Sequence, residues 1–457
     1  MSFTFDDIAR YPLPGVAVPT SIRFAADGKS IMYLNTAAGK KQELFQLDCE
    51  SGEEKILAGT PPSGGVQEGN LSAEEELRRQ RARMLATGIT HYEYNHETNK
   101  IMIPLNNHVY LLNEGDLEMV AQNAITPTFS PNGKAIGFVR DSEIFYLDLT
   151  ASTMDPVQIT SGARESGKTN GLADYIAQEE LERSEGFWFS PDSLYIAYCE
   201  VDETNIPEYT IVHQGKEQVS EEVHRYPFAG CENGTVRLAV TDVESKKVQW
   251  MNTTYEDDEM SEIYIARVFW WEDGSLGAEI LNREQSRLDL VRFDITTGER
   301  NIIITDRSEY WVNLFGEHLH FYELDAQKFL WISECSGFAH IYLVDKSTGE
   351  RSPVTDGNWV VDEIVGVDKE KQTVYFTGNK AHPTEKHFYK VSLDNPKELE
   401  QITKKQGMHQ ITVSKDCQYF VDVYSSLENP PVVSLHSLVC CIYIRNMNLT
   451  ICRAIIR

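Results

Sequence analysis

The chain has 457 residues, of which 41% are hydrophobic and 25% are charged, proportions of a folded globular protein rather than a disordered one. Asp and Glu number 70 against 42 Lys and Arg, so the formal net charge is −28. This balance argues against nucleic acid or an anionic membrane as a partner, and it suits a cationic ligand.

The first ten residues carry neither the basic region nor the apolar region of a secretory signal, and no run is long enough to span a bilayer. We therefore expect a cytoplasmic protein. The eight cysteines show no metal-ligand spacing, so reduced thiols are expected, with no metal site and no cofactor.

Short β-type runs separated by turn signals follow one another along the chain. Many begin after a turn in which a small residue or Ser-Pro precedes Asp or Asn, often with Gly, a combination that favours tight hairpins. This turn recurs at residues 24–28, 129–133, 189–192 and, in weaker form, 271–274. A second turn, Thr-Gly-Glu, follows strands at residues 297–299 and 348–350.

Hairpins repeated in this irregular way are typical of the blades of a β-propeller, each of which buries its faces only against its neighbours. We therefore predict an all-β fold, a β-propeller with irregular blades. An array of β-sandwiches is the alternative.

The only convincing helix covers residues 72–85. Ser72-Ala-Glu-Glu75 is a capping-box pattern, and Gly88 follows the helix. The helix carries Arg78, Arg79, Arg81 and Arg83, of which Arg79 and Arg83 share a face. From the residues alone, a solvated helix is as good an interpretation as a functional one.

Residues 162–169 (Gly-Ala-Arg-Glu-Ser-Gly-Lys-Thr) fit the pattern of a phosphate-binding loop. Such a loop needs a helix immediately after it, and Asn170-Gly171 interrupts the chain instead. We therefore expect a polar loop without a nucleotide.

Nucleophilic catalysis requires a Ser or Cys beside a base, and the strand-turn-helix signature G-x-S-x-G is absent from the chain. His318-Leu-His320 places two rings on one strand face, but no third metal ligand is indicated. No catalytic residue is predicted in this chain.

Glu179 and Glu180 are adjacent and lie shortly before the aromatic run Phe187-Trp-Phe-Ser-Pro-Asp192. Adjacent carboxylates repel each other, so a fold that keeps them together is suited to hold a cation. A solvated acidic helix is the plainer interpretation of an isolated Glu-Glu pair.

The flanking residues decide between these interpretations. Residues 174–180 (Asp-Tyr-Ile-Ala-Gln-Glu-Glu), followed by the aromatic run, closely resemble the double-Glu segment of the dipeptidyl peptidase IV family. Further similar segments follow in the family's order at residues 190–198, 225–230, 236–240, 331–342, 377–389 and 424–436.

The resemblance implies that residues 1–436 form the family's eight-bladed propeller. It implies that Glu179 and Glu180 bind the α-ammonium of a peptide with a free N-terminus, and that Arg83, or less clearly Arg79, reaches a backbone carbonyl of that peptide. The implied activity is serine-type release of N-terminal dipeptides with Pro or Ala at the second position. A homodimer is also implied.

The chain departs from the family's pattern after His436. Residues 437–457 contain three cysteines and three arginines but no acidic residue, and we expect them to be a disordered tail. The family's α/β-hydrolase domain, which supplies the catalytic Ser, Asp and His, is expected to be absent, so this chain alone should not hydrolyse peptides. The alternative is a non-catalytic peptide-binding or regulatory propeller, and a generic scaffold propeller ranks third.

Overall fold

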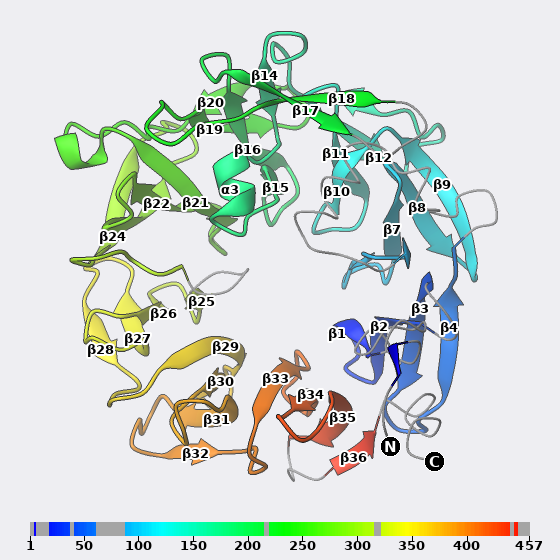
Figure 1. The fold of residues 1–457 in the computed structure, drawn as a ribbon, viewed down its shortest axis with the longest axis vertical. Coiled ribbons are helices and arrows are strands. Elements are labelled where there is room, and N and C mark those ends of the chain that lie inside the picture. Colours follow the sequence, from blue (N-terminus) through cyan, green and yellow to red (C-terminus); the bar gives the residue numbers. More distant parts are fainter. Residues whose placement is uncertain are drawn as a thin grey trace. The chain divides into compact units, whose positions relative to one another are not determined.

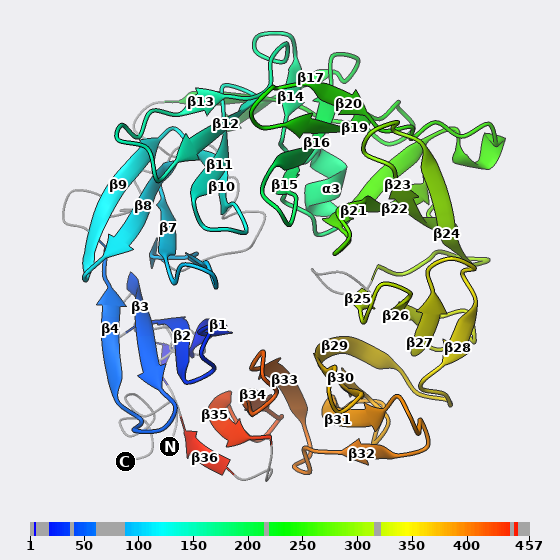
Figure 2. The same ribbon diagram turned by 180° about the vertical axis from the view of Figure 1, so that it is seen from behind.

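The structure is a computed structural model that describes residues 4–5, 18–36, 41–60, 87–213, 219–314, 321–438 and 443–446. Over these residues the chain is nearly all β and forms an eight-bladed β-propeller (Figure 1; Figure 2 from behind). The predicted fold is confirmed, and the β-sandwich alternative is wrong. The helix predicted over residues 72–85 lies outside the described residues.

The chain divides into two compact units, the first of which combines Met1–Gln122 with Asn313–Arg457. Its described residues form five blades, each with four antiparallel strands paired in chain order, and β5 adds to β3 in parallel. The N-terminal part of this unit supplies β1 (Thr20–Phe24), β2 (Ser30–Asn35), β3 (Lys41–Asp48), β4 (Glu54–Ala58), β5 (Thr87–Gly88), β6 (Glu93–Tyr94), β7 (Ile101–Leu105), β8 (His108–Asn113) and β9 (Asp116–Gln122). The C-terminal part supplies β25 (Phe321–Glu323), β26 (Lys328–Ser333), β27 (His340–Asp345), β28 (Arg351–Pro353), β29 (Val361–Asp368), β30 (Thr373–Gly378), β31 (His387–Ser392), β32 (Leu399–Gln401), β33 (Met408–Val413), β34 (Tyr419–Ser425), β35 (Val432–Ser437) and β36 (Tyr443–Asn446).

The second unit, Asn123–Val312, contains three blades and a separate hairpin among its described residues. The blades are built from β10 (Ile125–Phe129), β11 (Ala135–Arg140), β12 (Glu143–Asp148), β13 (Val157–Gln158), β14 (Lys168–Asn170), β15 (Phe187–Phe189), β16 (Tyr195–Asp202), β19 (Thr235–Asp242), β20 (Val248–Trp250), β21 (Ile263–Trp270), β22 (Leu276–Asn282), β23 (Arg287–Phe293) and β24 (Arg300–Arg307). The hairpin is β17 (Glu208–His213) with β18 (Ser220–Arg225). Two short helices interrupt this pattern, α3 (Tyr175–Glu179) and the 3-10 helix η1 (Asp258–Met260).

The predicted hairpin turns are present and are held by their own side chains. The Ser190 hydroxyl donates to Asp192 and accepts the amide N–H of Tyr195, at 2.9 Å. Ser130 makes the same contacts in the preceding blade. The position filled by Gly133 there, with φ +63°, is filled by Ser193 here, with φ +64°. Side-chain hydrogen bonds therefore fix these turns.

The core lies between the faces of successive blades. In the second unit, Val240 packs in one cluster with Ile265 and Leu276 of the next blade. In the first unit, Tyr33 of the first blade packs with Val433 of the last one, so the N-terminal and C-terminal parts of that unit share a core. Blades bury both faces in this way, as expected for a propeller.

The segment expected to be a disordered tail, residues 437–457, contains β36, which pairs with β35 as the outer strand of its blade. These four residues therefore differ from the expectation of disorder. The remainder of the segment beyond Leu438 lies outside the described residues.

Candidate functional site

Glu179 and Glu180 lie in a segment that leaves the sheet after β14 and returns to it at β15. Both ends of the segment are tied to Cys199 of β16: its carbonyl accepts from Gly171 N–H at 2.9 Å, and its N–H donates to Gly186 O at 2.8 Å. A Cβ at Gly186 would lie only 2.4 Å from the backbone of Gly171 and Leu172. The two ends therefore approach so closely that only glycine fits at this position.

Helix α3 carries the first glutamate and ends at the second. The Asp174 carboxylate caps the helix by accepting Ala177 N–H at 3.2 Å, and Glu180 is the C-cap. Glu179 and Glu180 are both exposed. Carboxylates at a helix C-terminus face the negative end of the helix dipole, so the helix itself disfavours this arrangement.

Arg183 contacts the segment at both ends, through Asp174 and Glu185. It is buried, its Nη2 lies 3.6 Å from a carboxylate oxygen of Asp174, and its Nη1 donates to Glu185 O. Its guanidinium also lies 5.7 Å from the centre of the Trp188 ring. Burial raises the pKa of the nearby Cys199 thiol to about 11, so that thiol is neutral and is no nucleophile.

A second buried arginine reaches the segment from the next blade. Nη1 of Arg267, on β21, donates to Leu181 O at 2.6 Å, directly after the two glutamates. Glu279, fully buried on β22, lies opposite Arg267 in the strand pairing. Burial lowers the pKa of Arg267, and the charge of Glu279 opposes this effect.

Aromatic side chains adjoin the helix. The Tyr175 ring of α3 packs edge to face on Tyr226, with centroids 5.3 Å apart, and Tyr226 contacts Phe228 and Tyr209 in turn. Tyr209, Tyr226 and Phe228 are partly exposed. Tyr226 and Phe228 lie in residues 225–230, one of the segments similar to the family, but no role was predicted for these rings.

The predicted binding residues are therefore placed in part. Glu179 and Glu180 are consecutive and both exposed, whereas Arg83 and Arg79 lie outside the described residues. The supporting residues Arg183, Arg267 and Glu279 were not predicted. For Arg267 and Glu279, the sequence offers one signal: each is a charged residue within a mostly apolar strand.

The loop that resembles a phosphate-binding loop runs into strand β14 at Lys168, with no helix after it. Two of its backbone amides are already occupied by a carboxylate. Oε1 of the buried Glu143 accepts from Ala163 N–H at 2.7 Å and Arg164 N–H at 3.2 Å, while Oε2 accepts from Thr160 and Asn170. The loop therefore binds a carboxylate of its own chain.

Within the described ranges, no three or more His, Cys, Asp or Glu side chains are grouped to hold a metal ion. The pair His318 and His320 falls outside them. The same part of the chain has no helix that is both long and apolar enough to cross a membrane.

Comparisons with known proteins agree on one family. Residues 90–431 match the model described as "Dipeptidyl peptidase IV (DPP IV) N-terminal region". Human dipeptidyl peptidase 8 is 25% identical over 464 aligned positions, which cover 81% of this chain and 51% of the human protein. Probable dipeptidyl peptidase 4 of Aspergillus flavus is 31% identical over 295 positions, 61% of this chain and 36% of that protein.

Among solved structures, Porphyromonas gingivalis dipeptidyl peptidase 4 superposes with a TM-score of 0.75 at 23% identity, over 94% of this chain and 60% of that one. At this identity the likeness shows the fold. The chain spans about half, or less, of the length of the curated relatives given above.

Proposed function

Because this chain belongs to the dipeptidyl peptidase IV family and matches its N-terminal region, we propose that it is the substrate-recognition propeller of a dipeptidyl peptidase. Glu179 and Glu180 bind the α-ammonium group of a peptide with a free N-terminus. The observation that carries this proposal is the pair itself, two adjacent exposed carboxylates at the end of a helix that is anchored from below.

The chemistry of the pair fits an amine. An ammonium group has three N–H donors and one positive charge, whereas ionised carboxylates only accept hydrogen bonds. Two adjacent carboxylates repel each other, and a cation between them relieves that repulsion. An acetylated N-terminus offers neither the charge nor the additional donors.

The proposed reaction of the whole protein is serine-type release of N-terminal dipeptides with Pro or Ala at the second position. Residues 1–436 recognise the substrate, and in the proposed reaction the catalytic Ser, Asp and His belong to the family's hydrolase domain. Arg83, with Arg79 as second choice, is proposed to contact the backbone carbonyl of the substrate.

The test is binding of an Ala-Pro peptide to the purified chain, measured by calorimetry or NMR titration, with the N-acetylated peptide beside it. We expect weak binding of the free peptide only. Glu179→Gln and Glu180→Gln should each weaken it about fivefold, because an exposed ion pair contributes up to ~1 kcal/mol.

The matched control is Glu182→Gln, which removes an exposed glutamate of the same segment and should leave the affinity unchanged. Equal affinity for the free and acetylated peptides would refute the proposal. Turnover of an Ala-Pro chromogenic substrate by the purified chain would refute the claim that it is non-catalytic alone.

We also propose a cytoplasmic homodimer. One observation supports self-association: the β17–β18 hairpin exposes Ile211, Val212 and Val223, and a two-stranded sheet is marginally stable without a partner. Light scattering on the purified chain measures its mass in solution and so tests the homodimer. Cell fractionation tests the cytoplasmic location. A monomer at micromolar concentration would contradict the first point.

A further inference from the structure

We propose that Arg267 is the positioning residue of the double-Glu segment: from the next blade, it holds the carbonyl group that directly follows Glu180 and so fixes how both carboxylates are presented to an amine. This inference rests on the proposed function and deepens it. It assigns the orientation of the binding pair to a residue 86 positions away in the chain.

The helix that bears the pair does not hold itself in place. It is five residues long, well below the roughly 12–15 residues at which an isolated helix becomes marginal in water. Its C-terminal carboxylates oppose its dipole. The carbonyls of Ile176 and Ala177 accept hydrogen bonds from Glu180, Leu181 and Arg183 within the segment. The Leu181 carbonyl, by contrast, is bound from outside.

Arg267 is placed for this contact by an irregularity in its strand. The pairing of β21 with β22 shifts register between Ile265 and Arg267, and such a bulge redirects the side chains beside it. Nη1 of Arg267 donates to Leu181 O at 2.6 Å and to Ala266 O, in its own strand, at 2.9 Å. The guanidinium therefore joins the segment directly to the backbone of the neighbouring blade.

The charge of each supporting arginine is balanced within the scaffold. Arg183 lies beside Asp174, and Arg267 lies opposite Glu279. Arg267 therefore holds the segment through the backbone carbonyl of Leu181 rather than through the carboxylate of Glu180. Neutralising either glutamate should change the affinity for the amine and leave the segment in place.

The decisive variant is Arg267→Met combined with Glu279→Leu. Removing Arg267 alone would leave a buried carboxylate without its counter-charge and endanger folding, whereas the double substitution replaces both charges by apolar side chains. We expect a folded chain with a melting temperature within a few degrees of wild type. Its preference for the free over the acetylated Ala-Pro peptide should fall at least fivefold.

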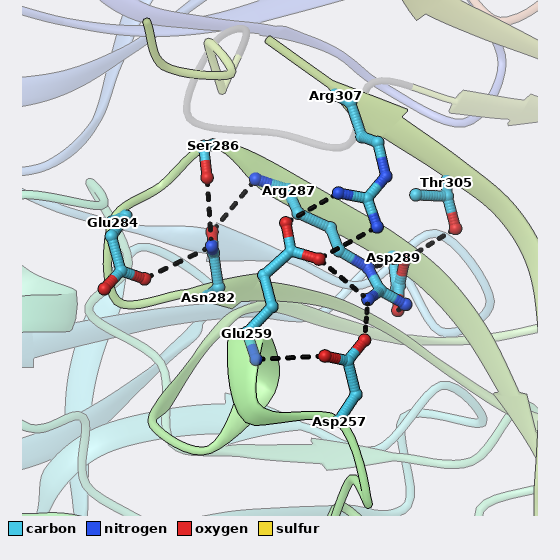
Figure 3. A network of polar contacts seen from close by, with 9 residues as sticks. All are labelled: Asp257, Glu259, Asn282, Glu284, Ser286, Arg287, Asp289, Thr305 and Arg307. Atoms are coloured by element: carbon cyan, nitrogen blue, oxygen red, sulfur yellow. Dashed lines mark hydrogen bonds and ion pairs between the residues drawn. The ribbon is translucent and has the colours of Figure 1, made fainter. Parts of the chain in front are cut away.

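The matched control is Arg287→Met with Asp289→Leu, which removes a buried arginine–carboxylate pair from the same blade. Nη2 of Arg287 lies 2.9 Å from Asp289, in a network with Asp257 and Glu259 that does not include the double-Glu segment (Figure 3). This control should keep the preference. An equal loss in the control would overturn the inference, because the effect would then be general to the blade.

A conservative variant separates charge from geometry. Arg267→Lys keeps a positive charge opposite Glu279 but lacks the planar group that reaches both carbonyls. We expect it to retain stability while recovering less than half of the lost preference. Full recovery would show that charge alone is needed and would contradict positioning.

Amide hydrogen exchange gives a readout that does not require a ligand. In the Arg267→Met/Glu279→Leu chain, the amides of Glu180, Leu181 and Arg183 should exchange at least tenfold faster, while those of β21 stay protected. Unchanged exchange would overturn the inference. If the free-amine preference is missing already in wild type, the proposed function fails, and exchange still decides whether Arg267 holds the segment.

Discussion

At the residue scale, the buried pair of His409 and Asp422 makes stability depend on pH. His409 Nδ1 lies 2.8 Å from Asp422 Oδ2, and Nε2 faces the Lys405 carbonyl at 2.8 Å. Burial alone would lower the pKa of His409, but the hydrogen bond and charge of Asp422 outweigh it, so the pKa is raised. The rings of His387 and Tyr424 pack beside it.

A raised pKa means that folding stabilises the protonated imidazole. This stability is fully present below the pKa of an unfolded histidine, about 6.5, and is lost as the pH rises through the higher folded value. Asp422→Asn should therefore destabilise the chain more at pH 5.5 than at pH 8.5, by about 1 kcal/mol, in urea unfolding. Asp362→Asn, whose partner is Lys386, should show no such difference. An equal loss at both pH values for Asp422→Asn would contradict this account.

The candidate site could be predicted in part from the sequence, for a physical reason. Glu179 and Glu180 are neighbours in the chain, so their proximity is visible in the sequence itself. Arg267 meets Leu181 only after two blades have packed together, and no local pattern encodes that contact. Arg183 lies in the same segment of sequence, but its burial follows from tertiary packing, which the sequence pattern does not show.

At the scale of elements, the same hydrogen bond from a backbone N–H to a threonine hydroxyl recurs in three blades. In these blades, the third strand begins at Glu143, His340 and His387, respectively. The backbone N–H of the residue that follows this first residue donates a hydrogen bond to the hydroxyl of a threonine, which lies two residues after the end of the fourth strand. The threonines are Thr160, Thr355 and Thr403, and all are buried. This hydrogen bond joins the start of the third strand to the chain just after the fourth strand in each of these blades.

Thr403→Val should lower the free energy of unfolding by about 1–3 kcal/mol, because it leaves the buried Phe388 N–H without its acceptor while keeping the side-chain volume. Urea unfolding measures the loss. Thr297→Val, in an exposed turn, should stay within about 0.5 kcal/mol of wild type. A similar small effect for Thr403→Val would show that another group or water satisfies Phe388.

Strands and turns were predictable because their signals are local. The alternation of apolar residues and the Ser-Pro-Asx turns fall within a few residues of each other, and the structure confirms them. A short acidic helix at Glu179 and Glu180 was only the plainer of two interpretations, because the five residues of α3 are too few to establish a helical period. The tertiary contacts of Arg183 and Arg267 hold it instead.

At the scale of the whole molecule, the propeller followed from repeated hairpins, but the number of blades did not. Insertions such as the β17–β18 hairpin and the double-Glu segment make the turn spacing uneven. The count of eight came from the family resemblance, and the structure confirms it. When the repeats vary in length, the sequence indicates the repeat architecture more clearly than the number of repeats.

The net charge of −28 predicts how the molecule responds to salt. Like charges repel across the folded chain, and salt screens that repulsion, so the melting temperature should rise by a few degrees between 10 and 200 mM NaCl. Choline chloride should give the same rise if screening is the cause. A fall would show that ion pairs such as Arg307 with Glu259 outweigh the net repulsion.

The carboxylate of Glu143 has a consequence for the loop that resembles a nucleotide site. It is an internal competitor: it binds the amides of Ala163 and Arg164 from the same chain, and a tethered group acts at an effective concentration on the order of millimolar or above. A phosphate from solution would have to displace this anion and then share the loop with its buried charge. The chain thus carries a nucleotide-binding signature that its own side chain keeps occupied.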